Sequence, residues 1–319
     1  MVIETSVDPM LEHHTYGQML ERLHGYTDAA VHVRTMDGYL KDPALVSGWG
    51  SPIAFVDLSL TDDPDSTIII TAGRHSPEYG GAEAAVELID KVLASPGMRE
   101  YLEHGEITIV PAVHVDAYGL QPEQRPAMYI PETGVYLDKE DFAQFDADRN
   151  DCHDTYRFDP STPTYQCELN YYEQLFEDPE LDPNGMAWRR TFPLMTREAF
   201  AVARLVEEKK ATRENVLFAA DLHETPREDF TYTTIVYEPE LVLVAEDAAK
   251  RVGEKYPTQA SLLHDDDCTF TGFCNTLEID AYTTEGSPFD GTRHRSMAER
   301  VEQQLLFLDA LFEHYLGKE

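Results

Sequence analysis

The chain has 319 residues, and its 60 Asp and Glu against 25 Lys and Arg give a formal net charge of −35. Such an acidic excess argues against nucleic-acid binding, which requires a basic face. No apolar run approaches the roughly 18 residues of a membrane-spanning helix. The first residues lack the basic start and apolar stretch of a secretion signal, so we expect a cytoplasmic protein.

The negative charge is spread over the whole length of the chain rather than gathered in one tail. A folded surface of this kind repels itself at low ionic strength. At molar salt the Debye length falls to about 3 Å and the repulsion is largely screened. We interpret the composition, with only eight lysines, as adaptation to a salt-rich cytoplasm, as in halophilic organisms. The alternative is an acidic protein of an ordinary cytoplasm.

Apolar patterns predict helices and strands that alternate along the chain. The predicted helices span 10–26, 80–95, 196–211, 240–256 and 298–316, with Asp8 and Thr196 as expected N-caps. The predicted strands span 29–36, 51–60, 66–73, 106–113, 215–222, 230–237 and 275–282, of which 230–237 alternates like an exposed or edge strand. This order predicts an α/β/α sandwich with a central, mostly parallel mixed sheet.

We expect one domain over residues 1–319, because no Ser/Gly linker divides the chain. Residues 120–195 are rich in Pro, Tyr and Asp and lack periodicity. A loop region of that length in a compact domain is usually functional. We therefore interpret it as an irregular insertion that forms a wall of the active site.

Histidines and carboxylates stand where three predicted strands end. His75 and Glu78 follow strand 66–73, and His223 follows strand 215–222. Glu278 lies in strand 275–282. Ligands collect at the carboxyl ends of strands in open α/β sheets, and two imidazoles with one carboxylate form the ligand set of a catalytic zinc ion. We predict one Zn²⁺ on His75, Glu78 and His223, with Glu278 as general base toward a water molecule.

This series of motifs, in this order, resembles the zinc carboxypeptidase family, including its aspartoacylase and succinylglutamate desuccinylase relatives. The resemblance covers about residues 66–282 and implies hydrolysis of an amide bond. The implied substrate is a small peptide or an N-acyl amino acid. We favour the carboxypeptidase activity, because deacylase relatives often carry an added C-terminal domain and only a helix follows Glu278 here. A non-catalytic metal-binding protein of the same fold is the third alternative.

The segment Asp146-Ala147-Asp148-Arg149 resembles the Asp-x-Asn-Arg segment of that family. The resemblance implies that Arg149 grips an anionic group of the substrate. It also implies that Asp146 orients His75 from behind the metal. Asp148 departs from the family asparagine, and a carboxylate only accepts hydrogen bonds. Asn150 is the candidate that would replace the missing donor.

Two further roles come from the same resemblance. Arg125 is placed like the arginine that polarises the scissile carbonyl. A tyrosine from a mobile loop usually assists in the family, and three tyrosines compete for that role here: Tyr232, Tyr256 and Tyr282.

Each site residue also has a purely structural interpretation. His75 and Glu78 suit an ordinary helix start, and His223 suits a core histidine. Arg125 and Arg149 would simply neutralise acidic neighbours. Glu278 would face water if its strand alternates. Residues 264–267 read His-Asp-Asp-Asp, which we interpret as a solvated loop rather than a second metal site, and we interpret Glu224 as acidic surface.

We expect KCl to stabilise the fold far beyond the effect of a neutral osmolyte, because it screens the repulsion between acidic side chains. Urea unfolding followed by circular dichroism, at about 0.2 M and about 3 M KCl, should show a higher midpoint at high salt. Sucrose at matched osmolality is the control, because it screens no charge. Equal midpoints in the two salt concentrations would contradict the interpretation.

Overall fold

The computed structural model describes residues 2–47, 50–74, 78–115, 118, 128–130, 135–137, 197–224, 231–262 and 269–317. Their main feature is an eight-stranded sheet in the order β1-β2-β4-β3-β7-β10-β8-β9. Its strands are β1 (Val31–Thr35), β2 (Ala54–Leu58), β3 (Ser66–Ala72), β4 (Gly105–Val110), β7 (Asn215–Glu224), β8 (Thr233–Tyr237), β9 (Thr258–Leu262) and β10 (Ala281–Gly286). A separate antiparallel pair joins β5 (Met128–Ile130) to β6 (Val135–Leu137).

The centre of the sheet is parallel: β4, β3, β7 and β10 pair side by side in one direction. On one side β2 pairs antiparallel with β4, and on the other β8 pairs antiparallel with β10. The central strands are apolar runs buried on both faces, as parallel sheets require. Their carboxyl ends therefore meet at one edge, which is where the candidate site lies.

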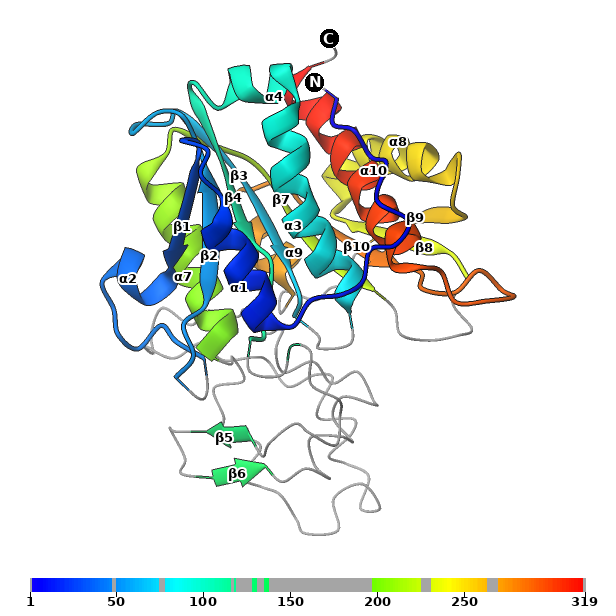
Figure 1. Cartoon of the computed structure of the whole chain (residues 1–319). Helices are drawn as coiled ribbons and strands as arrows, with labels where there is room; N and C mark the ends of the chain where they lie inside the picture. Colours follow the sequence, from blue (N-terminus) through cyan, green and yellow to red (C-terminus); the bar gives the residue numbers. More distant parts are fainter. Residues whose placement is uncertain are drawn as a thin grey trace.

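Helices cover both faces of the sheet (Figure 1). One face carries α1 (Tyr16–Gly25), α3 (Tyr79–Ala94), α8 (Val242–Gly253) and α10 (Met297–Leu316), and the other carries α7 (Arg197–Thr212) and α9 (Phe270–Thr276). Three short helices, α2 (Met36–Leu40), α4 (Pro96–Tyr101) and η3 (Pro239–Leu241), complete the described elements. The predicted α/β/α sandwich with a mostly parallel mixed sheet is confirmed, and no described helix is long and apolar enough to cross a membrane.

Several predicted boundaries are wrong. The first helix begins at Tyr16, because Thr15 and Gln18 form a capping box there, whereas Asp8 only makes a turn with Met10. The strand 230–237 is not at the edge of the sheet, since β9, which was not predicted, lies outside β8. The predicted strand 275–282 is wrong over most of its length.

The error at 275–282 has a local cause. Leu277, Ile279 and Ala281 alternate like a strand, but the side chain of Thr269 accepts a hydrogen bond from the backbone N–H of Gly272 at 3.1 Å and starts helix α9. That helix runs to Thr276, and strand β10 begins only at Ala281. A capping residue eight positions upstream thus decided the structure of this segment.

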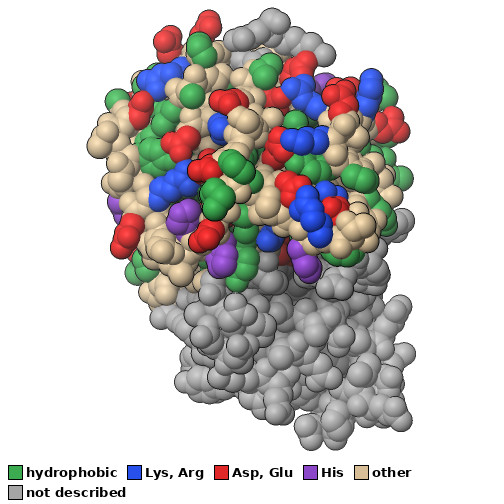
Figure 2. All heavy atoms as spheres, turned by 45° about the vertical axis from the view of Figure 1, so that its right-hand side comes forward, with side chains coloured by type: hydrophobic (Ala, Val, Ile, Leu, Met, Phe, Trp, Pro, Cys, Tyr) green, Lys and Arg blue, Asp and Glu red, His purple; other side chains and the backbone are tan. Residues whose placement is uncertain are grey.

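Acidic and basic side chains are interspersed on the face drawn in Figure 2. Many described cations are held in ion pairs, such as Arg22 with Glu87 at 2.6 Å and Lys255 with Glu302 at 2.6 Å. Paired cations leave the surplus acidic side chains to set the sign of the surface potential.

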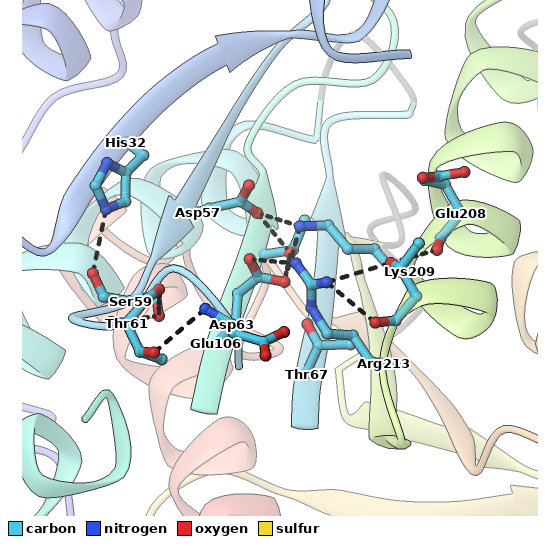
Figure 3. A network of polar contacts seen from close by, with 12 residues as sticks. His32, Asp57, Ser59, Thr61, Asp63, Thr67, Glu106, Glu208, Lys209 and Arg213 are labelled. Carbon is cyan, nitrogen blue, oxygen red and sulfur yellow. Dashed lines mark hydrogen bonds and ion pairs between the residues drawn. The ribbon is translucent and has the colours of Figure 1, made fainter. Parts of the chain in front are cut away.

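A buried ionic network lies under α7 (Figure 3). The Lys209 ammonium, fully buried, donates to Asp57 of β2 at 2.7 Å and to Glu106 of β4 at 2.8 Å. Arg213 donates to the other oxygen of Glu106 at 3.3 Å, and the Thr108 hydroxyl donates to Asp57 at 2.7 Å. Burial opposes ionisation of Glu106, but Lys209 and Arg213 together outweigh burial and lower the pKa of that carboxyl. The network fixes α7 against the sheet at the amino ends of the strands.

We expect Lys209→Met to lower the free energy of unfolding by about 3–5 kcal/mol, because two buried carboxylates lose their shared cation. Lys210→Met is the matched control on the same helix: its ammonium donates to the Glu278 carbonyl at 3.4 Å in a solvent-exposed hydrogen bond, so a change within about 0.5 kcal/mol is expected. Urea unfolding of both variants at one salt concentration measures the difference. Equal losses in the two variants would show that the buried network does not hold α7.

Candidate metal centre

His223 lies near the carboxyl end of β7, one residue before the strand ends at Glu224. The imidazole is buried, with 4% of the residue exposed. Its Nε2 lies 2.8 Å from an oxygen of Asp221, and its Nδ1 lies 3.2 Å from an oxygen of Glu78. Burial disfavours the charged ring, but Asp221 and Glu78 outweigh burial and raise the pKa of His223 well above its ordinary value. The two carboxylates therefore favour a positive charge at this ring.

The distance between His223 Nδ1 and Glu78 Oε2 is compatible with a zinc ion shared by the two side chains. A charge-assisted N–H···O bond normally measures about 2.7–2.9 Å. Two donors that share a tetrahedral zinc ion, each about 2.0–2.1 Å from it, lie about 3.3 Å apart. The observed 3.2 Å is closer to the second value. The carboxylate on Nε2 also fits, because ligating histidines almost always donate their other N–H to a carboxylate or carbonyl. This donor pair fits zinc.

Glu78 stands at the N-cap position of α3, but its side chain makes no capping hydrogen bond. The capping role falls to Glu224, which accepts from the backbone N–H of Gly80 at 2.9 Å and accepts from Nε and Nη2 of Arg300 with its two carboxylate oxygens. The interpretation of Glu224 as acidic surface is wrong, since only 2% of it is exposed. Because Glu224 caps the helix, the Glu78 carboxylate is left to face His223.

The first turn of α3 lies directly against β7. A Cβ at Gly81 would collide with the carbonyl oxygen of Leu222, so only glycine allows this approach. The close packing places Glu78, from the β3–α3 connection, within reach of His223, from β7.

Asp221 contacts His223 and Arg74 contacts Asp221, and neither residue was predicted from the sequence. Asp221 accepts from the Thr71 hydroxyl at 2.6 Å and from the Arg74 guanidinium. Both side chains are fully buried. The signal was the spacing: Asp221 lies two residues before His223 in one strand, so both side chains point to the same face of the sheet.

Glu278 does not lie at this edge, and its predicted place beside His223 is wrong. It is exposed and precedes β10, with a backbone φ of 56° in the turn after α9. Ala281 pairs with Ala219, and four residues of strand, about 13 Å, separate it from the position opposite His223. Glu278 lies still further back, at the amino end of the strand.

The residue opposite His223 in the neighbouring strand is Glu285. Paired residues of adjacent strands point to the same face, so Glu285 and His223 share one face at the carboxyl edge. Glu285 is half-buried. The missed signal is the run Tyr282-Thr283-Thr284, rich in β-branched residues, followed by Glu285 and the turn residues Gly286-Ser287-Pro288.

The other predicted site residues lie outside the described part of the chain. These are His75, Arg125, Asp146, Asp148, Arg149 and Asn150, together with the acidic run 264–267 and most of 120–195. Within the described residues, no three His, Cys, Asp or Glu side chains are grouped so as to hold a metal ion. The pair Glu78 and His223 therefore needs a third ligand, for which His75 is the prediction.

Two of the competing tyrosines have hydroxyls engaged elsewhere. The Tyr256 hydroxyl donates to Glu302 at 2.5 Å, and the Tyr282 hydroxyl lies 2.7 Å from that of Tyr315. Tyr282 is also at the start of β10, far from the carboxyl edge. Tyr232 lies just before β8, and its assisting role stays a prediction.

Comparison with solved structures identifies the architecture. Thrombin-activatable fibrinolysis inhibitor superposes with a TM-score of 0.61 at 14% identity, over 96% of this chain and 75% of that one. Carboxypeptidase A from Helicoverpa armigera gives 0.61 at 12% identity, over 94% and 73% of the two chains. A metallo-carboxypeptidase from Burkholderia cenocepacia gives 0.57 at 11% identity, over 94% and 68%.

The chain has the metallocarboxypeptidase fold. The family resemblance drawn from the sequence motifs and the structural likeness thus agree. No family model matches the sequence, and no curated protein matches it either. At identities this low the likeness establishes the fold, while the chemistry has to be argued from the side chains.

We expect Zn²⁺ to raise the thermal unfolding temperature, because an ion that binds only the folded chain stabilises it by about 2.7 kcal/mol at a hundredfold excess over its Kd. Glu78→Gln and His223→Gln should remove this shift. His14→Gln is the matched control, since His14 pairs with the buried Glu83 at 2.8 Å and is not one of the proposed ligands. Scanning calorimetry with and without zinc measures the shift. A zinc-induced shift that survives both site variants would place the ion elsewhere.

Proposed function

We propose that the protein is a zinc-dependent hydrolase that cleaves an amide bond, most simply as a carboxypeptidase acting on a small peptide. One observation supports this above all: His223 turns Nδ1 toward Glu78 at 3.2 Å while Asp221 occupies Nε2. This pair stands at the carboxyl edge of a sheet with the metallocarboxypeptidase fold. The assignment of one zinc ion to Glu78, His223 and His75 is part of the proposal.

A bound zinc ion would supply an acidified water and a Lewis acid for the scissile carbonyl. Glu285, half-buried on the same face as His223, would accept the proton of the attacking water and return it to the leaving amine. Glu285 thus takes the role that the sequence assigned to Glu278. Arg125 would polarise the carbonyl and Arg149 would hold the anionic end of the substrate.

A deacylase acting on an N-acyl amino acid is the second candidate. The observation that favours it is Asp148, which stands beside Arg149 where the family carries asparagine. A second negative charge there weakens the hold of the arginine on a terminal carboxylate. The substrate screen should therefore include blocked dipeptides and N-acyl amino acids, in molar KCl because we infer a salt-rich cytoplasm.

We expect Glu285→Gln to lower kcat by about 10²–10⁴-fold, because general-base catalysis contributes that much, while the bound zinc is retained. Glu278→Gln is the matched control. It makes the same chemical change at a residue that precedes β10, whereas Glu285 lies near the carboxyl end of that strand. Its kcat should equal that of the unmodified protein. Steady-state kinetics and metal analysis of both variants in parallel make the comparison.

The reverse result, with hydrolysis lost in Glu278→Gln and kept in Glu285→Gln, would restore the assignment made from sequence and overturn this one. A protein that binds one zinc ion and hydrolyses neither substrate class would support the non-catalytic alternative.

A further inference from the structure

We infer that Asp221 and Arg74 form a positioning pair, which fixes the nitrogen that His223 offers to Glu78 and so sets the metal affinity of the site. The inference rests on the proposed zinc site, but the hydrogen positions that it predicts can also be observed in the metal-free protein.

Asp221 has both carboxylate oxygens engaged. One oxygen accepts from the Thr71 hydroxyl at 2.6 Å. The other accepts from Arg74 Nε and lies 2.8 Å from His223 Nε2. A carboxylate held from three directions cannot rotate away from the imidazole. Only 1% of Asp221 is exposed, so water does not compete for these bonds.

Arg74 is the largest fully buried side chain among the described residues. Its guanidinium binds Asp221, reaches the Thr71 hydroxyl at 3.3 Å, and stacks over the Phe270 ring with 4.8 Å between the guanidinium carbon and the ring centroid. Arg74, Asp221 and Thr71 close a ring of hydrogen bonds between the ends of β3 and β7. Arg74 directly precedes His75, the predicted third ligand, in the chain.

This ring of hydrogen bonds decides which nitrogen of the His223 imidazole is offered to a metal ion. Carboxylate oxygens only accept, so both ring nitrogens can carry a hydrogen while no metal ion is bound; when a metal ion takes the place of the hydrogen on Nδ1, the remaining hydrogen resides on Nε2, toward Asp221. The lone pair then resides on Nδ1, toward Glu78. Lone pairs of an imidazole and a carboxylate that face each other at 3.2 Å repel unless a cation lies between them. Asp221 and Arg74 therefore hold an arrangement that a metal ion completes.

The pair is better explained by positioning than by stability. A buried ion pair is often no more stabilising than apolar residues of similar volume. Here the buried ion pair consists of Arg74 and Asp221, and Asp221 lies directly behind the candidate ligand His223. The network of Lys209 with Asp57 and Glu106 shows a comparable buried arrangement at the opposite edge of the sheet, and it provides the control.

We expect Asp221→Asn to weaken zinc binding about 10–100-fold, as substitutions behind metal ligands typically do, with one ion still bound at saturation. Asp57→Asn makes the same change in the other buried network and should leave zinc affinity unchanged, whatever it does to stability. Competition with a chelator of known affinity, in molar KCl, measures both. Arg74→Lys keeps the charge, loses the fork that binds Asp221, and should also weaken zinc binding; it serves if Asp221→Asn does not fold.

A second measurement shows directly which nitrogen of His223 carries the hydrogen. Nitrogen-15 NMR of the histidine side chains, with His223 assigned through His223→Gln, should show the hydrogen of His223 on Nε2 in the zinc-loaded protein. The metal-free protein should show a slowly exchanging Nε2–H that is lost in Asp221→Asn. A zinc-loaded His223 protonated on Nδ1, or equal zinc affinity in Asp221→Asn and the unmodified protein, would overturn the inference. If the unmodified protein binds no zinc, the proposed function fails, while an Asp221-dependent Nε2–H would still support the positioning pair.

Discussion

One imidazole between two carboxylates is the constraint on which the arrangement of this edge of the sheet depends. His223 has Asp221 on Nε2 and Glu78 on Nδ1, at 2.8 Å and 3.2 Å, and is almost completely buried. Two acceptors cannot face one neutral ring without a cation, and burial removes the water that would otherwise screen them. A positive charge on or beside the ring is therefore needed to offset the repulsion between these two buried carboxylates.

The fold holds these charges in place rather than allowing them to separate. Parallel pairing of β3 with β7 and of β7 with β10 brings Arg74, His223 and Glu285 to one edge. Glu224 clamps the first turn of α3 through Gly80 and Arg300. At this edge the carboxylates of Asp221 and Glu224 pair with the guanidinium groups of Arg74 and Arg300. At the amino edge, Asp57 and Glu106 pair with Lys209 and Arg213. The proposed metal ion would lie at the first of these edges, between Glu78 and His223.

The sequence predicted the fold class and much of the order of elements, because the central strands are apolar runs and most helices have a clear apolar face. The predicted position of Glu78 and His223 at one edge was also correct. Each residue follows or ends a buried strand, so its predicted position does not depend on the exact residue at which the strand ends. The prediction of Glu278 failed because it depended on a boundary. The alternation of Leu277 with Ile279 outweighed the cap at Thr269 that starts α9, and the error displaced the candidate base by seven residues, from Glu285 to Glu278.

Asp221, Arg74 and Glu224 could not be assigned from sequence for another reason. Their roles depend on contacts across 144 to 147 positions of the chain, and a chain so rich in acidic residues makes any one carboxylate look like surface. Only burial distinguishes Asp221 and Glu224 from the surplus acids around them. The resemblance to zinc carboxypeptidases helped because its motifs mark strand ends, but it offered no signal for the residues behind His223.

The most direct test of the account is anomalous diffraction at the zinc absorption edge from crystals of the zinc-loaded protein grown in high salt. The account predicts one strong anomalous peak about 2.0–2.1 Å from His223 Nδ1 and about 2.0–2.2 Å from a Glu78 oxygen, with Asp221 still bonded to Nε2. An empty site with a direct hydrogen bond between His223 and Glu78, or an anomalous peak elsewhere in the molecule, would contradict it.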